Sequence, residues 1–194
     1  MSENRRKVRL LPAIAAVLAL LTSSCFADQV PRPSPDFTIL TNSGPPIQIS
    51  QYRGKAIALI FLLTTCPHCQ KTVGILSKLQ TEYGPKGFQV AGCAIQDMAS
   101  LFVPDFVKKF QPGFPVGFSE RGPVLTYLQH PEMLQLLMPQ VVFIDRNFTI
   151  QAQYSGDNAI FTDDQEAKLR AVIEPLLAKR TEARKSVVSR KKTP

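Results

Sequence analysis

The most regular hydrophobic pattern in the chain lies between residues 56 and 83. It begins with the unbroken apolar run Ala56 to Leu63, which follows a turn at Tyr52-Arg53-Gly54-Lys55. Such a run predicts a strand buried on both faces, because a half-exposed strand would alternate apolar and polar positions. From Pro67 the apolar positions take helical spacing, at Val73, Leu76 and Leu79, until Tyr83-Gly84-Pro85 ends the helix. A buried strand is therefore expected to lead directly into a helix.

The rest of the chain continues this alternation of strands and helices. Short apolar runs at 37–40 and 47–49, separated by turn-forming residues, predict a pair of N-terminal strands. The further predicted elements are a strand at 88–95, a helix at 98–109 despite Pro104, short helices at 124–128 and 132–137, strands at 140–145 and 148–154 joined by a turn, and a last helix capped by Thr162-Asp163-Asp164 with a kink at Pro175. This order predicts an α/β fold with an antiparallel addition to its sheet.

Residues 1–27 have the features of a secretory signal peptide. Basic residues come first, an apolar run from Leu10 to Leu21 follows, and small residues lead to a cleavage point after Ala27. The apolar run is shorter than the roughly 20 residues that a membrane-spanning helix needs. We therefore expect an exported protein, periplasmic or anchored to the membrane and facing the periplasm of a bacterial envelope.

Two outcomes of processing are open. Cys25 could be lipidated as in bacterial lipoproteins, but Thr22 stands three residues before it, where such signals normally have leucine. Cleavage after Ala27 is therefore favoured. A lipid on Cys25 or an uncleaved leader would tether the protein to the membrane.

The net charge of +8 belongs to the ends of the chain. Residues 28–178 hold 12 basic and 13 acidic side chains, while residues 179–194 hold seven basic ones against one acidic one. A nucleic-acid-binding domain would carry its basic residues on the fold itself, so we do not expect a nucleic-acid partner. With 194 residues, 44% of them hydrophobic, the chain is long enough for one domain with a substantial core.

Three boundaries follow from composition. Pro31, Pro33 and Pro35 predict an extended linker over residues 28–36. The domain is expected to span residues 37–180. From Lys185 to the end, the chain is basic and poor in apolar residues, which predicts a disordered tail over residues 185–194.

Cys66 and Cys69 stand at the junction of the buried strand and its helix. One helical turn separates them, which brings their sulfurs within reach of a disulfide bond. The unpaired N–H groups at a helix start favour a thiolate at Cys66, the predicted attacking sulfur, while Cys69 lies one turn in as the resolving thiol. Because disulfides persist outside the cytosol, an exported pair of this spacing is interpreted as a redox pair.

The two residues between the cysteines fit this chemistry. Pro67 suits the first turn of a helix, where no backbone donor is needed. His68 can stabilise a neighbouring thiolate by charge or by a hydrogen bond, and stabilising the reduced form makes the couple more oxidising.

Other cysteine and histidine residues offer weaker alternatives. A zinc site would need two further ligands from His68, Cys93, His130 and Cys25, which supply no second C-x-x-C or H-x-x-H spacing. Cys93 lies in an apolar strand and is interpreted as a core residue. His130 is assigned no role, and we expect neither a metal nor a cofactor.

These motifs, taken in order, resemble the thioredoxin superfamily, and most closely the exported TlpA/ResA-type thiol-disulfide oxidoreductases. The resemblance covers about residues 35 to 180 and rests on Pro35-Asp36-Phe37, Tyr52-Arg53-Gly54-Lys55, Cys66-Pro67-His68-Cys69, Phe114-Pro115-Val116 and Met138 to Asp145. It implies a thioredoxin-like three-layer sandwich, with a mixed central sheet flanked by helices and an N-terminal strand pair. It also implies an enzyme that exchanges disulfides with protein thiols, including a redox partner.

In that family the proline that matches Pro139 is cis and faces the cysteine pair. The resemblance therefore implies that Met138 and Pro139 line the place where a partner's disulfide docks. Thr65 departs from the family, which usually has tryptophan before the first cysteine. The Pro-His pair is also found in the oxidant DsbA, whereas the overall layout is that of reductases, so we expect a reductase but leave both directions of electron flow open.

Two rival functions share this fold. A thiol peroxidase would need proline and a hydroxyl residue at the positions of Leu59 and Leu63. A copper metallochaperone of the Sco type usually has three residues between its cysteines, and here it would need His130 as a distant ligand.

Overall fold

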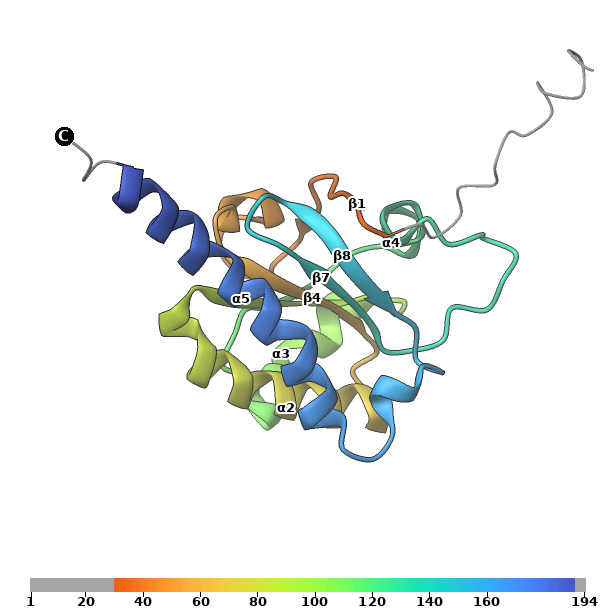
Figure 1. Cartoon of the computed structure of the whole chain (residues 1–194). Helices are drawn as coiled ribbons and strands as arrows, with labels where there is room; N and C mark the ends of the chain where they lie inside the picture. The colour runs from red at the N-terminus through yellow and green to blue at the C-terminus, as the bar shows by residue number, and fades with distance from the viewer. Residues whose placement is uncertain (1–29, 191–194) are drawn as a thin grey trace, which may run out of the picture.

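The computed structural model describes residues 30–190. At its centre lies a six-stranded sheet with the strand order β1-β8-β7-β4-β5-β6 (Figure 1). These strands are β1 (Arg32–Pro33), β4 (Ala56–Leu62), β5 (Phe88–Ala94), β6 (Val116–Phe118), β7 (Gln140–Ile144) and β8 (Thr149–Tyr154). Strand β4 pairs in parallel with β5 and antiparallel with β7, so the sheet is mixed.

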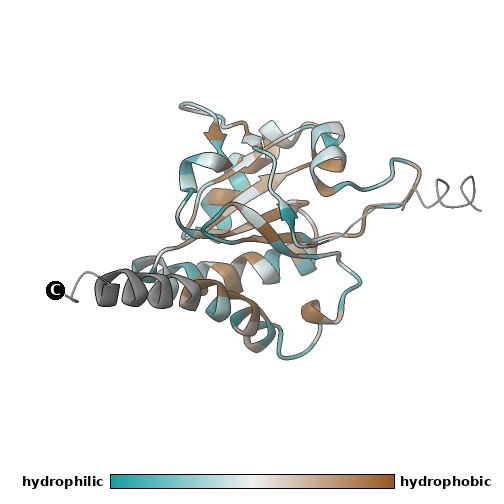
Figure 2. Cartoon of the chain, turned by 45° about the horizontal axis from the view of Figure 1, so that its top comes forward, coloured by the Kyte–Doolittle hydropathy of each residue, from teal (hydrophilic) through white to brown (hydrophobic). Residues whose placement is uncertain are grey.

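Strand β4 divides the hydrophobic core into two halves. All seven of its residues are buried, as the unbroken apolar run predicts. Ala58 and Ile60 face the core half that contains Val73 of helix α2 (Pro67–Tyr83), whereas Leu59 and Phe61 face the other half. Successive strand residues point to opposite faces, so both faces of the strand must be covered. Figure 2 shows hydrophobic residues (brown) mainly in the sheet and along the helices, with hydrophilic residues (teal) frequent in the surrounding loops.

The two halves of the core are covered by different elements. Helices α2, α3 (Ala99–Phe110) and α5 (Gln165–Arg190) pack on one face of the sheet. Helix α4 (Arg121–Leu128) and the small antiparallel sheet of β2 (Thr38–Ile39) and β3 (Ile47–Gln48) cover the other. The short helices η1 (Ile49–Tyr52), η2 (Gly84–Lys86) and η3 (Ala159–Phe161) complete the described elements. The predicted three-layer α/β sandwich with an N-terminal strand pair is confirmed.

The segment predicted as a linker differs from the expectation. Within residues 28–36, strand β1 pairs with β8 at the edge of the main sheet. Ser34 is buried, where its backbone N–H donates to Phe148 O at 2.9 Å and its hydroxyl lies 2.9 Å from that of Tyr127. Proline is tolerated in an edge strand, because one side of such a strand needs no ladder donors. The packed part of the chain therefore begins before Phe37.

One further expectation is wrong. No helix forms at 132–137, where the chain makes turns and irregular structure and Met133 is 98% exposed. Pro131 and Pro139 bound this segment, which leaves little room for a helix. At the other end, α5 runs to Arg190, into the segment 185–194 for which disorder stays a prediction. Low apolar content argues against packing, but lysine, arginine, alanine and glutamate still favour a helix.

Several predictions concern residues outside the described part of the chain. These are the signal peptide at 1–27, the alternative lipidation at Cys25 and the last four residues of the tail. Between residues 30 and 190, no helix combines the length and apolar character required to cross a membrane.

Candidate active site

Cys66 occupies the junction between β4 and α2 that the sequence pattern predicts. Its backbone N–H donates to Leu63 O at 3.1 Å, which closes a turn at the end of the strand. Cys66 is the N-cap residue of α2 with extended backbone angles, and Pro67 follows in the first turn. A proline there loses no hydrogen bond, since the first N–H groups of a helix have no intrahelical acceptor. The thiol of Cys66 therefore sits at the positive end of the helix dipole.

The two thiols of the motif differ in their surroundings. Cys66 is half-buried, whereas Cys69 is fully buried against the sheet. The backbone N–H of Cys69 donates to Cys66 Sγ at 3.5 Å. Burial raises the pKa of the Cys69 thiol well above its usual value. The accessible sulfur with a hydrogen-bond donor is suited to attack, and the shielded thiol is suited to the second, internal step.

His68 and Pro67 are both exposed beside the cysteines. The carbonyl of His68 accepts a hydrogen bond of 2.8 Å from the hydroxyl of Thr72, which in turn accepts one of 2.8 Å from the side-chain amide of Gln165. Thr72 and Gln165 are buried, so this chain of neutral hydrogen bonds ties the first turn of α2 to the start of α5. The imidazole of His68 makes no hydrogen bond within residues 30–190 and faces solvent.

Met138 packs against the same half of the core as Cys66, and the peptide bond between Met138 and Pro139 is cis. Because Gln140 is paired with Phe61, the antiparallel register brings Pro139 level with Leu62 at the end of β4. Pro139 is buried and Met138 is partly buried. The structure thus agrees with the cis bond that the resemblance implies.

A glycine packs directly against this cis-proline segment. A β-carbon at Gly156 would overlap the backbone of Met138, whose nitrogen would lie only 2.8 Å away. The backbone N–H of Gly156 donates to Leu137 O at 3.2 Å, and the side-chain amide of Gln140 donates to the same oxygen at 2.6 Å. The position of Met138-Pro139 is therefore fixed from two sides. Sequence reasoning missed Gly156, which has no motif and becomes visible only through this contact.

Sequence reasoning also missed the residues that hold the turn before Cys66. The side chains of Gln96 and Gln70 bind the backbone of Thr64. Gln96 lies two residues beyond the end of strand β5, the parallel neighbour of β4, and the only available signal was a polar residue close to that strand end.

The remaining candidates are separate from this site. Cys93 is fully buried in β5 and belongs to the core half opposite to that of Cys69, and burial raises the pKa of its thiol. His130 Nδ1 donates to the carbonyl of Pro131 at 2.9 Å. No group of three or more His, Cys, Asp or Glu side chains that could hold a metal ion occurs in the described part of the chain. Cys66, Cys69 and Cys93 are free thiols.

This geometry, a C-x-x-C motif at a helix start beside a cis-proline, agrees with comparisons to known proteins. Residues 29–173 match the redoxin family. The chain belongs to this family. Its curated relatives include the thiol-disulfide oxidoreductase ResA of Bacillus cereus, 27% identical over 165 residues that cover 81% of this chain and 91% of the relative. ResA of Geobacillus kaustophilus is 24% identical and covers 86% and 94% of the two chains.

Solved structures show the same fold. A thiol:disulfide interchange protein of the thioredoxin family from Chlorobium tepidum superposes with a TM-score of 0.63 at 21% identity, over 78% of this chain and 99% of that one. A protein from Sinorhizobium meliloti superposes with a TM-score of 0.65 at 18% identity, over 78% and 86%. Like its curated relatives, this redoxin is a thiol-disulfide oxidoreductase of ResA/TlpA type with a thioredoxin-like fold.

Proposed function

We propose that this redoxin exchanges disulfides with protein partners outside the cytoplasm, and that it acts as a reductase. The observation that carries the exchange chemistry is the contrast between the half-buried Cys66 at the start of α2 and the buried Cys69 one turn later. In this arrangement one sulfur reacts with partners and the other reacts only within the protein.

The exchange has two steps that balance in atoms and electrons. The thiolate of Cys66 attacks one sulfur of a partner disulfide, so that a Cys66–partner bond forms and the second partner sulfur leaves as a thiolate. Cys69 then loses its proton and attacks Cys66 Sγ. The Cys66–Cys69 disulfide forms, the first partner sulfur leaves, and two electrons have passed to the partner.

Each site residue has a place in this scheme. Met138 and Pro139 lie level with the end of β4, where a partner strand would approach Cys66. The raised pKa of Cys69 keeps this thiol protonated, which protects it until the mixed disulfide forms beside it. To His68, whose ring is exposed between the cysteines, we assign the tuning of the balance between thiolate and disulfide.

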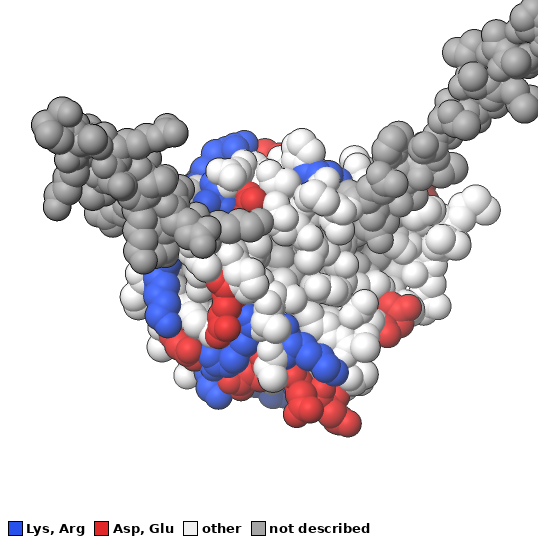
Figure 3. All heavy atoms as spheres, viewed as in Figure 1, with Lys and Arg blue, Asp and Glu red and all other residues white. Residues whose placement is uncertain are grey.

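The surroundings of the motif suggest the character of the partner. Residues 56–70 and 133–144 contain no Lys, Arg, Asp or Glu. Figure 3 shows the charged side chains gathered mainly over α2 and α5, with broad uncharged areas elsewhere on this face. A partner segment with an uncharged, partly apolar sequence around its cysteine fits such a site, because burying an unpaired charge there would be unfavourable.

The equilibrium reduction potential of the Cys66–Cys69 pair tests the direction of electron flow. The purified protein is titrated against glutathione and against dithiothreitol, and the oxidised fraction is followed by mass spectrometry. A value near that of thioredoxin, about −270 mV, supports a reductase. A value near that of DsbA, about −120 mV, makes the protein an oxidant, and the lack of a titratable disulfide contradicts the proposal.

The proposed export has its own test. The protein is isolated from the cell envelope, and the mass of its N-terminal fragment is measured. An N-terminus at Asp28 indicates cleavage after Ala27, and a lipid mass on Cys25 indicates a membrane tether. An intact leader on a cytoplasmic protein contradicts export.

A further inference from the structure

The turn that leads into Cys66 is held by two glutamine side chains. The backbone N–H of Thr64 donates to Gln96 Oε1 at 2.9 Å, and Gln96 Nε2 donates to the hydroxyl of Thr64. Gln70 Nε2 donates to the carbonyl of Thr64 at 2.8 Å. Every polar group of Thr64 thus has a partner from another part of the chain.

Strand geometry explains why side chains are needed at this point. The last backbone hydrogen bond between the parallel strands β4 and β5 runs from Ile95 N to Leu62 O at 3.1 Å. Beyond it, the chain after β4 must turn into α2, so Thr64 loses its partner in the ladder. Thr64 is only 6% exposed, and water cannot readily replace that partner. The side-chain amide of Gln96, one residue after Ile95, takes the place of the backbone partner that Thr64 lacks.

The contacts of Gln96 and Gln70 with Thr64, called the Thr64 clamp below, connect directly to the sulfur of Cys66. Thr64 and Thr65 are the central residues of the turn closed by the hydrogen bond from Cys66 N to Leu63 O. On the other side, the backbone N–H of Gln70 donates to Cys66 O at 3.0 Å, while its side chain binds Thr64. Movement of Thr64 would therefore move Cys66 relative to the Cys69 N–H that contacts its sulfur.

We infer that Gln96 is a positioning residue for thiol-disulfide chemistry. It acts through Thr64, fixing the Cys66 sulfur at the N-terminus of α2, where the dipole and the Cys69 N–H stabilise the thiolate. The inference rests on the proposed function of Cys66 as the attacking sulfur. It adds a residue from a neighbouring strand that touches neither cysteine.

The test measures the reactivity of Cys66 without any partner protein. The reduced full-length protein is treated with iodoacetamide over a range of pH, and the modification of Cys66 is followed by mass spectrometry. Gln96→Ala removes both contacts that Gln96 makes with Thr64, and we expect alkylation of Cys66 at neutral pH to slow about three- to tenfold, because a misplaced sulfur loses its stabilisation. The rise of the rate with pH is expected to move to higher pH. Thr64→Val, which removes only the hydroxyl, gives a smaller loss of about twofold.

Gln89→Ala provides the matched control. Gln89 lies near the other end of β5 and also uses both ends of its amide, to Lys55 Nζ at 3.3 Å and to Val90 O at 3.0 Å. The Gln89→Ala variant should lose a similar amount of folding free energy, and its pH profile of Cys66 alkylation should match that of the wild type. A Gln96→Ala profile identical to that of Gln89→Ala overturns the inference.

A double variant distinguishes positioning from general damage. The Thr64 hydroxyl acts only through Gln96, so Gln96→Ala with Thr64→Val should be no slower than Gln96→Ala alone. Additive effects contradict the clamp, and if Gln96→Ala does not fold, an unchanged profile for Thr64→Val overturns it instead. Turnover with a disulfide substrate is measured separately: a wild-type protein without turnover refutes the proposed function, while the alkylation results still decide the role of Gln96.

Discussion

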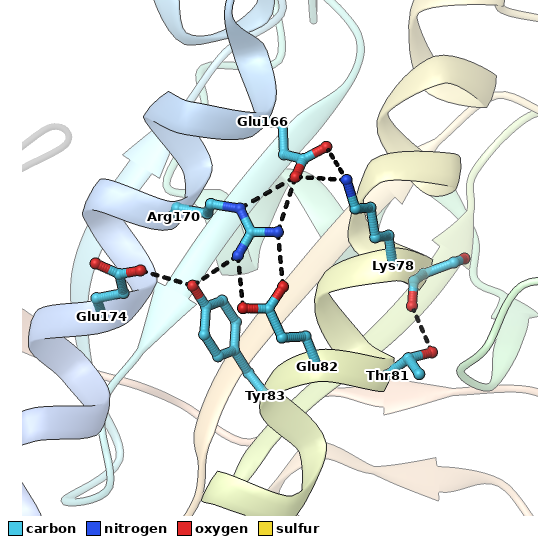
Figure 4. A network of polar contacts seen from close by, with 8 residues as sticks. Lys78, Thr81, Glu82, Tyr83, Glu166, Arg170 and Glu174 are labelled. Atoms are coloured by element: carbon cyan, nitrogen blue, oxygen red, sulfur yellow. Dashed lines mark hydrogen bonds and ion pairs between the residues drawn. The ribbon is translucent and has the colours of Figure 1, made fainter.

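The two ends of helix α2 contact the same neighbour, α5, through different kinds of interaction, one neutral and one charged. At the N-terminal end the contact is the buried, neutral hydrogen bond between Gln165 and Thr72. In the C-terminal half it is a charged network around Arg170 (Figure 4). Arg170 binds Glu82 at 2.7 Å and Glu166 at 2.8 Å, and donates to the hydroxyl of Tyr83 at 2.9 Å.

This network extends further along both helices. Lys78 lies 2.9 Å from Glu166, and the hydroxyl of Tyr83 donates to Glu174 at 2.7 Å. The two halves of α2 are thus held to α5 by different kinds of interaction. Charges hold the half of α2 that is remote from the cysteines, while the reactive end is fixed without them. A fixed charge beside Cys66 would alter the stability of its thiolate. A neutral hydrogen bond orders the helix and has little electrostatic effect on that thiolate.

The cysteines give the largest expected effect at the reactive end. Cys66→Ser should lower turnover with a disulfide substrate about 10³-fold or more, since the attacking sulfur is gone. Cys69→Ser should instead accumulate a mixed disulfide, which a shift on a non-reducing gel detects. If Cys69→Ser never traps a partner, the assigned order of attack is wrong.

Gly156→Ala tests the cis-proline side of the same end. The added methyl group would push against the backbone of Met138, and we expect turnover to fall about tenfold or more. Overpacking of this kind also costs about 1–3 kcal/mol of folding free energy, measured by urea unfolding. Unchanged turnover would show that the position of Met138-Pro139 does not matter for exchange.

Arg170→Met tests the charged end. At neutral pH we expect the melting temperature to fall by a few degrees with turnover retained, because the network lies away from the cysteines. The hydrogen bond from Arg170 lowers the pKa of Glu82, and the hydrogen bonds from Lys78 and Arg170 lower the pKa of Glu166. Their stabilisation is therefore present above the usual glutamate pKa of about 4.3 and is lost as the pH falls below it.

The difference in melting temperature between Arg170→Met and wild type should thus shrink in acid and in high salt. Arg121→Met is the matched control, since Arg121 is exposed on α4 and has no ion pair in the described residues. A difference that persists below the pKa of both glutamates would mean that Arg170 stabilises by packing on Tyr83, over whose ring it lies at 5.5 Å.

Gly74→Ala is expected to give the smallest effect. Gly74 lies between the two ends of α2, is exposed, and would place its β-carbon in open space. Alanine favours the helix over glycine by up to about 1 kcal/mol, so chemical unfolding should show a slightly more stable protein with wild-type turnover. A loss of turnover would show that the reactive end depends on flexibility within α2.

Much of this molecule could be predicted from local pattern. The strand β4, the start of α2 at Pro67 and the position of Cys66 follow from an apolar run that changes to helical spacing. Strand β1 did not follow, because proline-rich sequence indicates an extended chain without indicating that a sheet edge accepts it. A short apolar segment such as 132–137 favours burial without fixing a helix.

The supporting residues of the site could not be predicted for another reason. Gln96 and Gly156 act on Thr64 and Met138, which lie 32 and 18 positions away in the sequence. Their roles depend on strand register and on contacts between loops, which no local pattern records. The cysteine motif was found because its chemistry is contained within four consecutive residues.

The placement of Cys93 has a consequence under oxidative stress. Cys69 packs on the α2 face of the central sheet and Cys93 on the opposite face. The sheet therefore insulates the third thiol from the pair, and disulfides cannot shuffle between them while the fold is intact. An oxidant would first convert the thiol of Cys66 to a sulfenic acid, which condenses with Cys69 to the disulfide and releases water, while the buried Cys93 stays reduced.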